Sequence, residues 1–169
     1  NRIISHGSFS YPKSLYAVID CLVAASGKNK DALILDFFAG SGTTGHAVLE
    51  MNKQDGGNRR FILCTNNENG IAEEVTYPRL KNVILGYSNV AGISANLRYY
   101  KTSYVDKEMV SDDTRYALVK RSTEMLCIRE DCYEKVFVAE DERFKLFRNS
   151  VRVTAILFDI TAFDDFREY

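Results

Sequence analysis

The stretch ALILDFFAGSGTTG, residues 32–45, decides the fold of this chain. Residues 32–38 form an apolar run of strand length that carries Asp36 near its end. A glycine-rich turn follows, and a helical pattern opens at Thr43. A buried strand that leads through a tight glycine loop into a helix N-terminus is a cofactor-binding layout of open α/β sheets. We therefore expect an α/β fold with a ligand site at this turn.

The overall composition is that of a soluble globular protein, with 46% hydrophobic and 27% charged residues in a chain of 169. A formal net charge of −1 provides no basic field for gripping nucleic acid. Neither a signal peptide nor an apolar run of membrane-spanning length is present, so we expect a cytoplasmic protein without membrane contact. Because the chain begins at Asn1 and stops soon after Phe166, we expect both ends to be cut.

Cysteine and histidine are too sparse to suggest a metal site. The four cysteines form no CxxC pair, and the only histidines are His6 and His46, so zinc-site spacing is absent. We expect Cys21 and Cys64, which fall within apolar patterns, to be small buried hydrophobic residues. We expect His46, in the first turn of a helix, to have a packing or surface role.

The segments around the glycine turn predict a βαβ unit. A helix is expected over residues 12–26, with Gly27 as its C-terminal stop. After the strand at 32–38, a helix should cover 43–54 and a second buried strand 60–65, parallel to the first through a right-handed crossover. The apolar face of the first helix should comprise Leu15, Ile19, Leu22 and Val23.

Further along, residues 70–86 have a helical pattern that Pro78 should split or kink. Residues 97–105 are aromatic and β-prone, which predicts a third strand. Residues 1–106 are therefore predicted to form a Rossmann-like half-sheet with parallel strand order 3-2-1.

The pattern changes after Asp106. One helix is expected from Asp112 to Arg129, and a last helix near Thr161. Between them, we expect three antiparallel strands at 134–138, 144–148 and 151–158. We therefore predict that residues 107–169 form a small, truncated C-terminal α+β module without a chemical motif of its own.

Three kinds of ligand can be compared for the glycine turn: a dinucleotide, a nucleotide held by a P-loop, and S-adenosylmethionine. Residues 40–45 match the GxGxxG pattern of dinucleotide sites, and Glu68, after the second strand, could accept hydrogen bonds from ribose hydroxyls. A nicotinamide or flavin is thus one hypothesis, although Asp36 would be an unfavourable neighbour for a phosphate. A P-loop does not fit, because no lysine follows the glycines.

S-adenosylmethionine fits the same residues better, because it has no phosphate and carries an ammonium and a sulfonium. Asp36 can bind the ammonium, and Glu68 can bind the ribose. The hydroxyls and amides from Ser41 to Thr44 can bind the carboxylate at the helix N-terminus.

The turn resembles motif I of the β-class, circularly permuted, amino-methylating DNA methyltransferases. The wider context, residues 51–60, 65–68 and 96–102, resembles the modification subunits of type III restriction–modification systems, and the resemblance runs from about Phe9 to Val105. The cofactor residues that motif I implies are Asp36, Phe37, Phe38, Ala39, Gly40, Ser41, Gly42, Thr43 and Thr44.

The segment from Phe9 to Leu15 resembles motif X of the same class, which lies just upstream of motif I. Lys13 is a candidate for binding the cofactor carboxylate, and a solvated lysine at a helix start is the competing interpretation. The cofactor residues carried over from this motif are Tyr11, Pro12, Lys13 and Ser14. Residues 1–106 would thus hold motifs X, I, II and III of an S-adenosylmethionine-dependent methyltransferase.

The resemblance implies methyl transfer from S-adenosylmethionine to the N6 amino group of adenine in double-stranded DNA, with the base extruded from the duplex. It also implies a homodimer of modification subunits and a possible restriction subunit as partners. The catalytic Asp/Asn-Pro-Pro-Tyr motif of these enzymes is absent, because the only prolines are Pro12 and Pro78. We therefore expect the cofactor half of an active site, no catalytic residue, and no activity in this chain alone.

Two alternatives stay open at this point. One is a domain that binds NAD or a flavin at the glycine turn. The other is an assembly module, in which residues 112–169 contact a second modification subunit or a restriction subunit.

Overall fold

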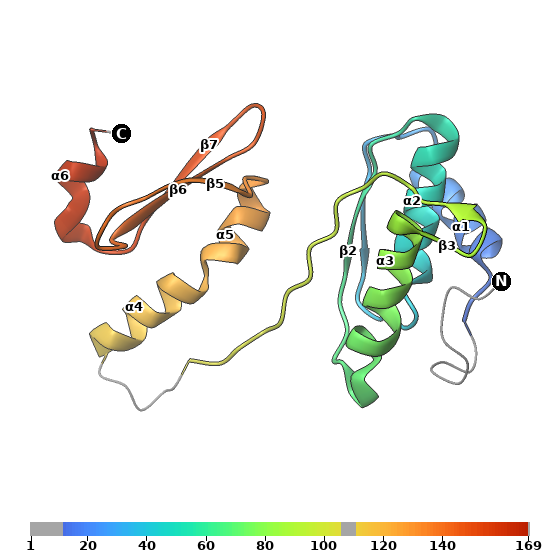
Figure 1. Cartoon of the computed structure of the whole chain (residues 1–169), viewed down its shortest axis with the longest axis horizontal. Helices are drawn as coiled ribbons and strands as arrows, with labels where there is room; N and C mark the ends of the chain where they lie inside the picture. The colour runs from blue at the N-terminus through green and yellow to red at the C-terminus, as the bar shows by residue number, and fades with distance from the viewer. Residues whose placement is uncertain (1–11, 106–110, 169) are drawn as a thin grey trace. The chain divides into compact units, whose positions relative to one another are not determined.

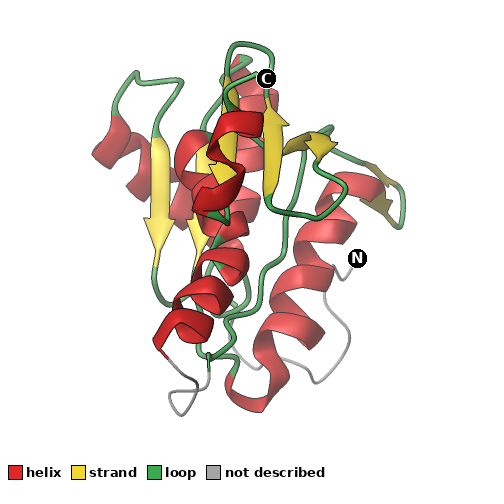
Figure 2. Ribbon diagram, turned by 90° about the vertical axis from the view of Figure 1, so that its left-hand side faces the viewer, coloured by secondary structure: helices red, strands yellow, loops and turns green. Residues whose placement is uncertain are grey.

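The computed structural model describes residues 12–105 and 111–168. Helices and strands are mixed along the chain, as Figure 2 shows in red and yellow. The chain divides into two compact units, residues 1–100 and 101–169 (Figure 1). The sequence placed the boundary slightly later, after residue 106. Within the described residues, no helix combines the length and apolar character that crossing a membrane requires.

The first unit is built around a β-α-β crossover. Strand β1 (Leu33–Asp36) leads to helix α2 (Thr43–Asp55), which is followed by strand β2 (Arg60–Leu63). The two strands are parallel, with Leu33 opposite Arg60 and Asp36 opposite Leu63. This confirms the predicted βαβ unit. Helix α1 (Leu15–Ser26) precedes it and packs on α2.

After β2 the chain forms a composite helix that packs against α2. A short 3₁₀ turn, η1 (Glu68–Gly70), leads to a π-helical turn, η2 (Ala72–Thr76), and then to helix α3 (Tyr77–Leu85). Pro78 lies in the first turn of α3, where its missing N–H group breaks no helical bond. The helical pattern predicted for residues 70–86 is found, but it is not split into two helices at Pro78: the backbone changes from π-helical to α-helical at Tyr77, and Thr76 and Tyr77 both have helical φ and ψ angles. Two short antiparallel strands follow, β3 (Gly86–Tyr87) and β4 (Val90–Ala91).

The core of the first unit lies between α2, α3 and one face of the strands. Helix α2 buries Ala47, Val48 and Met51, as its periodicity predicted. Gly45 brings this helix close to its neighbours: a Cβ atom at that position would stand 2.9 Å from Leu80 Cδ2. The helix can approach α3 this closely because Gly45 has no side chain. A buried cluster of Leu49, Val83 and Ile93 closes one end of the core.

Two predictions about the sheet are wrong. Strand β1 is not buried on both faces, because Leu33 is 55% exposed and Leu35 is 51% exposed. Residues 97–105 form no strand, so the described sheet has only the order β1-β2 instead of 3-2-1. The aromatic residues of that segment make side-chain contacts instead: the rings of Tyr99 and Tyr77 lie 5.3 Å apart. High β-propensity reflects packing on a pleated surface and does not supply a hydrogen-bonding partner strand.

Helix α1 also differs from the prediction. It starts at Leu15 rather than Pro12, and it ends at Ser26, after which Gly27, with a φ of 57°, provides the expected C-terminal stop. None of its residues is fully buried, and Val23, predicted on the packing face, is half exposed. Cys21 is exposed and Cys64 is only half-buried, so the expectation of two buried cysteines is wrong.

The second unit consists of two helices joined end to end and an antiparallel sheet (Figure 1). The predicted single helix is two, α4 (Ser111–Arg121) and α5 (Thr123–Glu130). The three predicted strands are confirmed as β5 (Glu134–Val138), β6 (Phe144–Arg148) and β7 (Val153–Leu157), paired antiparallel in that order. A 3₁₀ turn, η3 (Ile160–Ala162), and helix α6 (Phe163–Phe166) follow. The core of the second unit is a cluster of Cys127, Cys132, Phe147, Ile156 and Phe158.

Candidate cofactor site

Asp36 ends strand β1 and holds the start of the glycine turn. Its Oδ2 accepts a hydrogen bond of 2.6 Å from the Thr44 hydroxyl, and its Oδ1 accepts one of 3.0 Å from the Phe38 amide. Asp36 itself is half-buried. A carboxylate has about four acceptor sites on its two oxygens. Asp36 therefore ties strand to helix and keeps capacity to bind a cation.

The backbone of the turn adopts a conformation that glycine permits. Gly40 and Gly42 have φ angles of 52° and 77°, in the left-handed region. The Ala39 amide donates to the Cys64 carbonyl of the neighbouring strand end at 3.0 Å, and the Gly42 amide donates to the Ala39 carbonyl at 2.8 Å. Gly42 is the N-cap of α2 and has no side chain to satisfy the first amides of the helix. Those amides are donors for an anion.

Thr76 and Arg79 brace this turn from behind. The Thr76 hydroxyl donates to the Gly40 carbonyl at 2.6 Å. Arg79 Nη1 donates to the Ser41 and Thr43 hydroxyls at 2.9 and 2.7 Å. Ser41 and Thr43 are both buried. The sequence predicted that their hydroxyls bind the cofactor carboxylate, and in the structure these hydroxyls accept hydrogen bonds from Arg79.

The sequence analysis missed both bracing residues. A signal was present, because Thr76, Arg79 and Val83 recur at the spacing of one helical face. An arginine on an otherwise apolar stripe indicates a buried polar contact rather than a solvated side chain. The π-helical turn just before α3 includes Thr76, and such turns are frequent at functional sites.

His46 completes the buried group beneath the turn. It is 2% exposed, and its Nδ1 lies 3.5 Å from Arg79 Nη2. Burial, and then the positive charge of Arg79, lower the pKa of His46 from 6.5 to about 4. A neutral imidazole with its lone pair on Nδ1 can accept from the guanidinium. The expected packing role of His46 is consistent with this burial.

The other sequence-predicted site residues lie at the surface. Glu68 is exposed at the start of η1, beyond the carboxyl end of β2, so the parallel pairing places it at the same sheet edge as Asp36. Asn67 precedes it with a φ of 56°, and its side-chain oxygen accepts from the Ala72 amide at 2.9 Å. Phe37 and Phe38 are 64% and 89% exposed, which leaves two aromatic rings next to the turn uncovered.

The motif X residues stay predictions. Pro12, Lys13 and Ser14 are exposed just before α1, and no hydrogen bond links them to the turn in the part of the chain that the structure describes. Tyr11 lies outside the described residues.

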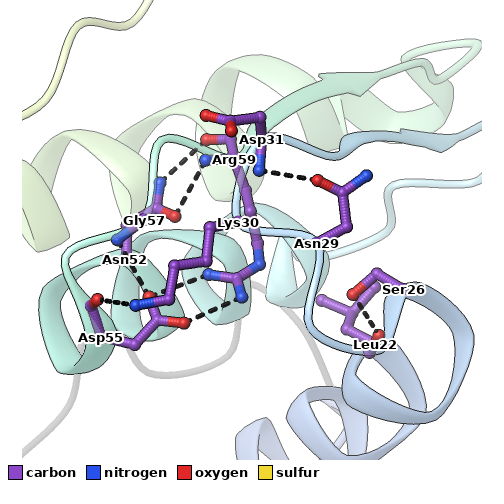
Figure 3. Close-up of polar contacts among 9 residues, drawn as sticks. All are labelled: Leu22, Ser26, Asn29, Lys30, Asp31, Asn52, Asp55, Gly57 and Arg59. Atoms are coloured by element: carbon purple, nitrogen blue, oxygen red, sulfur yellow. Dashed lines mark hydrogen bonds and ion pairs between the residues drawn. The ribbon is translucent and has the colours of Figure 1, made fainter.

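A second polar group lies at the opposite end of α2 (Figure 3). Arg59 binds Asp55 through two hydrogen bonds, Nη1 to Oδ1 at 3.0 Å and Nη2 to Oδ2 at 2.9 Å. The hydrogen bond from Arg59 is the main reason that the pKa of Asp55 falls from 3.8 to about 2. Asn52 exchanges two hydrogen bonds with the Arg59 backbone, at 2.8 and 3.0 Å. This group fastens the end of α2 to the start of β2.

The described residues contain no group of three or more His, Cys, Asp or Glu side chains that could hold a metal ion. The first unit has one group of polar side chains at the turn and another at the Asp55–Arg59 pair. Of these two, the turn combines an accessible carboxylate with helix amides and exposed aromatic rings.

Comparison with known proteins defines the class. Residues 8–104 match the model of the DNA methylase family N6_N4_Mtase, and the chain belongs to this family. The chain is 42% identical over 74 residues to the type III restriction-modification enzyme StyLTI Mod subunit of Salmonella typhimurium. It is 45% identical over 60 residues to the EcoPI Mod subunit of Escherichia phage P1, and 34% identical over 109 residues to the type II methyltransferase M.KpnI of Klebsiella pneumoniae.

These matches cover 41%, 36% and 62% of this chain, respectively. They cover only 11%, 9% and 24% of the relatives, so the matched region spans a small part of each relative's length. The family is one of methyltransferases, which generally use S-adenosylmethionine as the methyl donor.

Proposed function

We propose that this chain is the cofactor-binding part of a DNA adenine-N6 methyltransferase of a type III restriction–modification system. The methyl group would pass from S-adenosylmethionine to the adenine amino nitrogen of double-stranded DNA. Membership in the DNA methylase family and similarity to two Mod subunits support this assignment. The same evidence favours S-adenosylmethionine over NAD or a flavin.

The observation that carries the proposal is the donor and acceptor set at the turn. Asp36 is half-buried, each of its oxygens accepts one hydrogen bond, and the remaining acceptor capacity of the carboxylate suits the cofactor ammonium. The amides at the N-terminus of α2 suit its carboxylate. Glu68 at the same sheet edge suits the ribose hydroxyls. A dinucleotide would instead place phosphates beside Asp36, which is electrostatically unfavourable.

When bound, the cofactor supplies the reactive methyl group. The residues of this chain hold it: Asp36 would fix the amino-acid part, and the exposed rings of Phe37 and Phe38 would cover the neighbouring surface. We further propose that the 169 residues alone do not methylate DNA, because they contain no Asp/Asn-Pro-Pro-Tyr motif to hold the adenine. The exposed Leu33 and Leu35 are consistent with a further segment that packs on β1 in a longer protein.

The proposed partners follow the same reasoning. They are double-stranded DNA, a second modification subunit in a homodimer, and a restriction subunit. Light scattering of the chain with and without residues 101–169 tests an assembly role for the second unit. An association state that depends on this unit would support that role, and an unchanged monomeric mass would argue against it.

Isothermal titration calorimetry tests the cofactor assignment. We expect the chain to bind S-adenosylhomocysteine, Asp36→Ala to abolish binding, and the exposed control Asp20→Ala to leave it unchanged. A thermal-shift comparison with NAD should show stabilisation by S-adenosylhomocysteine only. Stabilisation by NAD instead, or no binding of S-adenosylhomocysteine after the catalytic half is restored, would contradict the proposal.

A further inference from the structure

Arg79 is a buried cation without a carboxylate partner. It is 6% exposed, and no Asp or Glu side chain lies within ion-pair distance of it among the described residues. Its Nε is buried and has no hydrogen-bond partner. A buried charge is costly unless a counter-charge or a full set of hydrogen bonds compensates it. The fold alone does not explain why an arginine occupies this position.

Among the described residues, the hydrogen-bond partners of Arg79 all belong to the glycine turn and the first turn of α2. They are the carbonyl and hydroxyl of Ser41, the hydroxyl of Thr43 and Nδ1 of His46. None of these groups, a carbonyl, two hydroxyls and an imidazole, is an anion. The guanidinium therefore stands next to the positive end of the α2 dipole, and the two fields add at the turn.

We propose that Arg79 is a positioning residue for the cofactor carboxylate. It fixes the Ser41 and Thr43 oxygens, and its charge lies behind the helix amides that would face the carboxylate. This inference rests on the proposed function, because it assumes that the turn binds S-adenosylmethionine. It assigns the carboxylate to the α2 side of the site and the ammonium to Asp36.

Arg59 provides a matched control in the same unit. It is also 6% exposed and also has a buried Nε without a partner, but its guanidinium is paired with Asp55. It lies at the other end of α2, where no cofactor group is proposed. Replacing Arg59 therefore removes a buried guanidinium without changing the charge at the turn.

The test compares two ligands that differ only in the carboxylate: S-adenosylmethionine and its decarboxylated analogue. Calorimetry is carried out on the whole chain and on Arg79→Met, Arg79→Lys and Arg59→Met. We expect Arg79→Met to weaken the binding of S-adenosylmethionine about tenfold and that of the analogue less than about twofold. Arg79→Lys, which keeps the charge, should recover part of the loss, and Arg59→Met should leave both affinities unchanged.

Circular dichroism and thermal unfolding establish that each variant is folded. If Arg79→Met does not fold, the same ratio of affinities is measured on Arg79→Lys, for which a smaller, carboxylate-specific loss is expected. An equal loss for both ligands, or no loss for either, would overturn the positioning role while leaving the cofactor assignment in place. If the unaltered chain binds neither ligand, even with the catalytic half restored, the cofactor assignment itself fails.

Discussion

Arg59 and Arg79 lie at opposite ends of α2, and both are almost fully buried, but their surroundings differ in charge. Arg59 has a bidentate carboxylate partner, Asp55, whereas the hydrogen-bond partners of Arg79 among the described residues are neutral oxygens and a neutral histidine. The first arrangement is complete in itself and stabilises a connection between helix and strand. At the other end, the positive charge of Arg79 has no carboxylate partner among the described residues and lies next to the glycine turn, which is rich in amide donors. The comparison supports the proposal that the Arg59 end serves the fold and the Arg79 end serves a ligand.

The largest predicted effect concerns pH and the Arg79 end. The pKa of His46 is about 4 in the folded chain and about 6.5 when unfolded, so the unfolded chain binds more protons between these values. The stability contributed by neutral His46 is full above pH 6.5 and decreases as the pH falls to 4, by at most about 3 kcal/mol. Denaturant unfolding at several pH values measures this, and His46→Asn should flatten the dependence in that window. An unchanged slope in His46→Asn would show that Arg79 and burial do not keep His46 neutral.

The next effect concerns the Arg59 end. Arg59→Met removes a buried bidentate partner of Asp55 and is expected to lower the free energy of unfolding by about 2 kcal/mol. Arg79→Met should cost less, because the removed charge has no ionic partner. Urea denaturation of both variants measures the difference. A larger loss for Arg79→Met than for Arg59→Met would reverse the comparison.

A smaller effect is expected at Thr76. Thr76→Val removes the 2.6 Å hydrogen bond to the Gly40 carbonyl while keeping the shape of the side chain. The expected loss of stability is about 1 kcal/mol, typical of one hydrogen bond. Ser94→Ala, an exposed control in the same unit, should change it little. Equal stability of Thr76→Val and the unaltered chain would mean that Thr76 does not brace the turn.

The smallest effect is confined to strong acid. The pKa of Asp55 lies at about 2 instead of 3.8, so its contribution is present above pH 3.8 and is lost as the pH falls through 2. A carbon-13 NMR titration of the Asp55 carboxyl group measures this pKa directly. In Arg59→Met it should rise back towards 3.8. A pKa near 3.8 in the unaltered chain would show that the pair is not formed in solution.

The sequence predicted those features that depend on nearby residues. The strand, glycine turn and helix at 32–45 follow from local periodicity and from glycine, and the β-α-β unit was confirmed. The three strands of the second unit were also found at nearly their predicted bounds.

The features that were missed depend on distant partners. Thr76 and Arg79 contact the turn across 36 to 38 residues of sequence, and the helical spacing of these residues indicates a shared face without showing what that face contacts. The third strand was wrong because an aromatic segment needs a neighbouring strand, which propensity cannot provide. The exposed Leu33 and Leu35 were unexpected because apolar character indicates that a face can be buried and does not show what buries it.

The most direct test of the central claim, that the turn after β1 binds S-adenosylmethionine, is an amide NMR titration of the chain with S-adenosylhomocysteine. We predict that the largest chemical-shift changes occur at the amides of residues 36–44 and at Glu68, with little change at Asp55 and Arg59. Saturable binding with its largest shift changes elsewhere, and none at residues 36–44, would contradict the account.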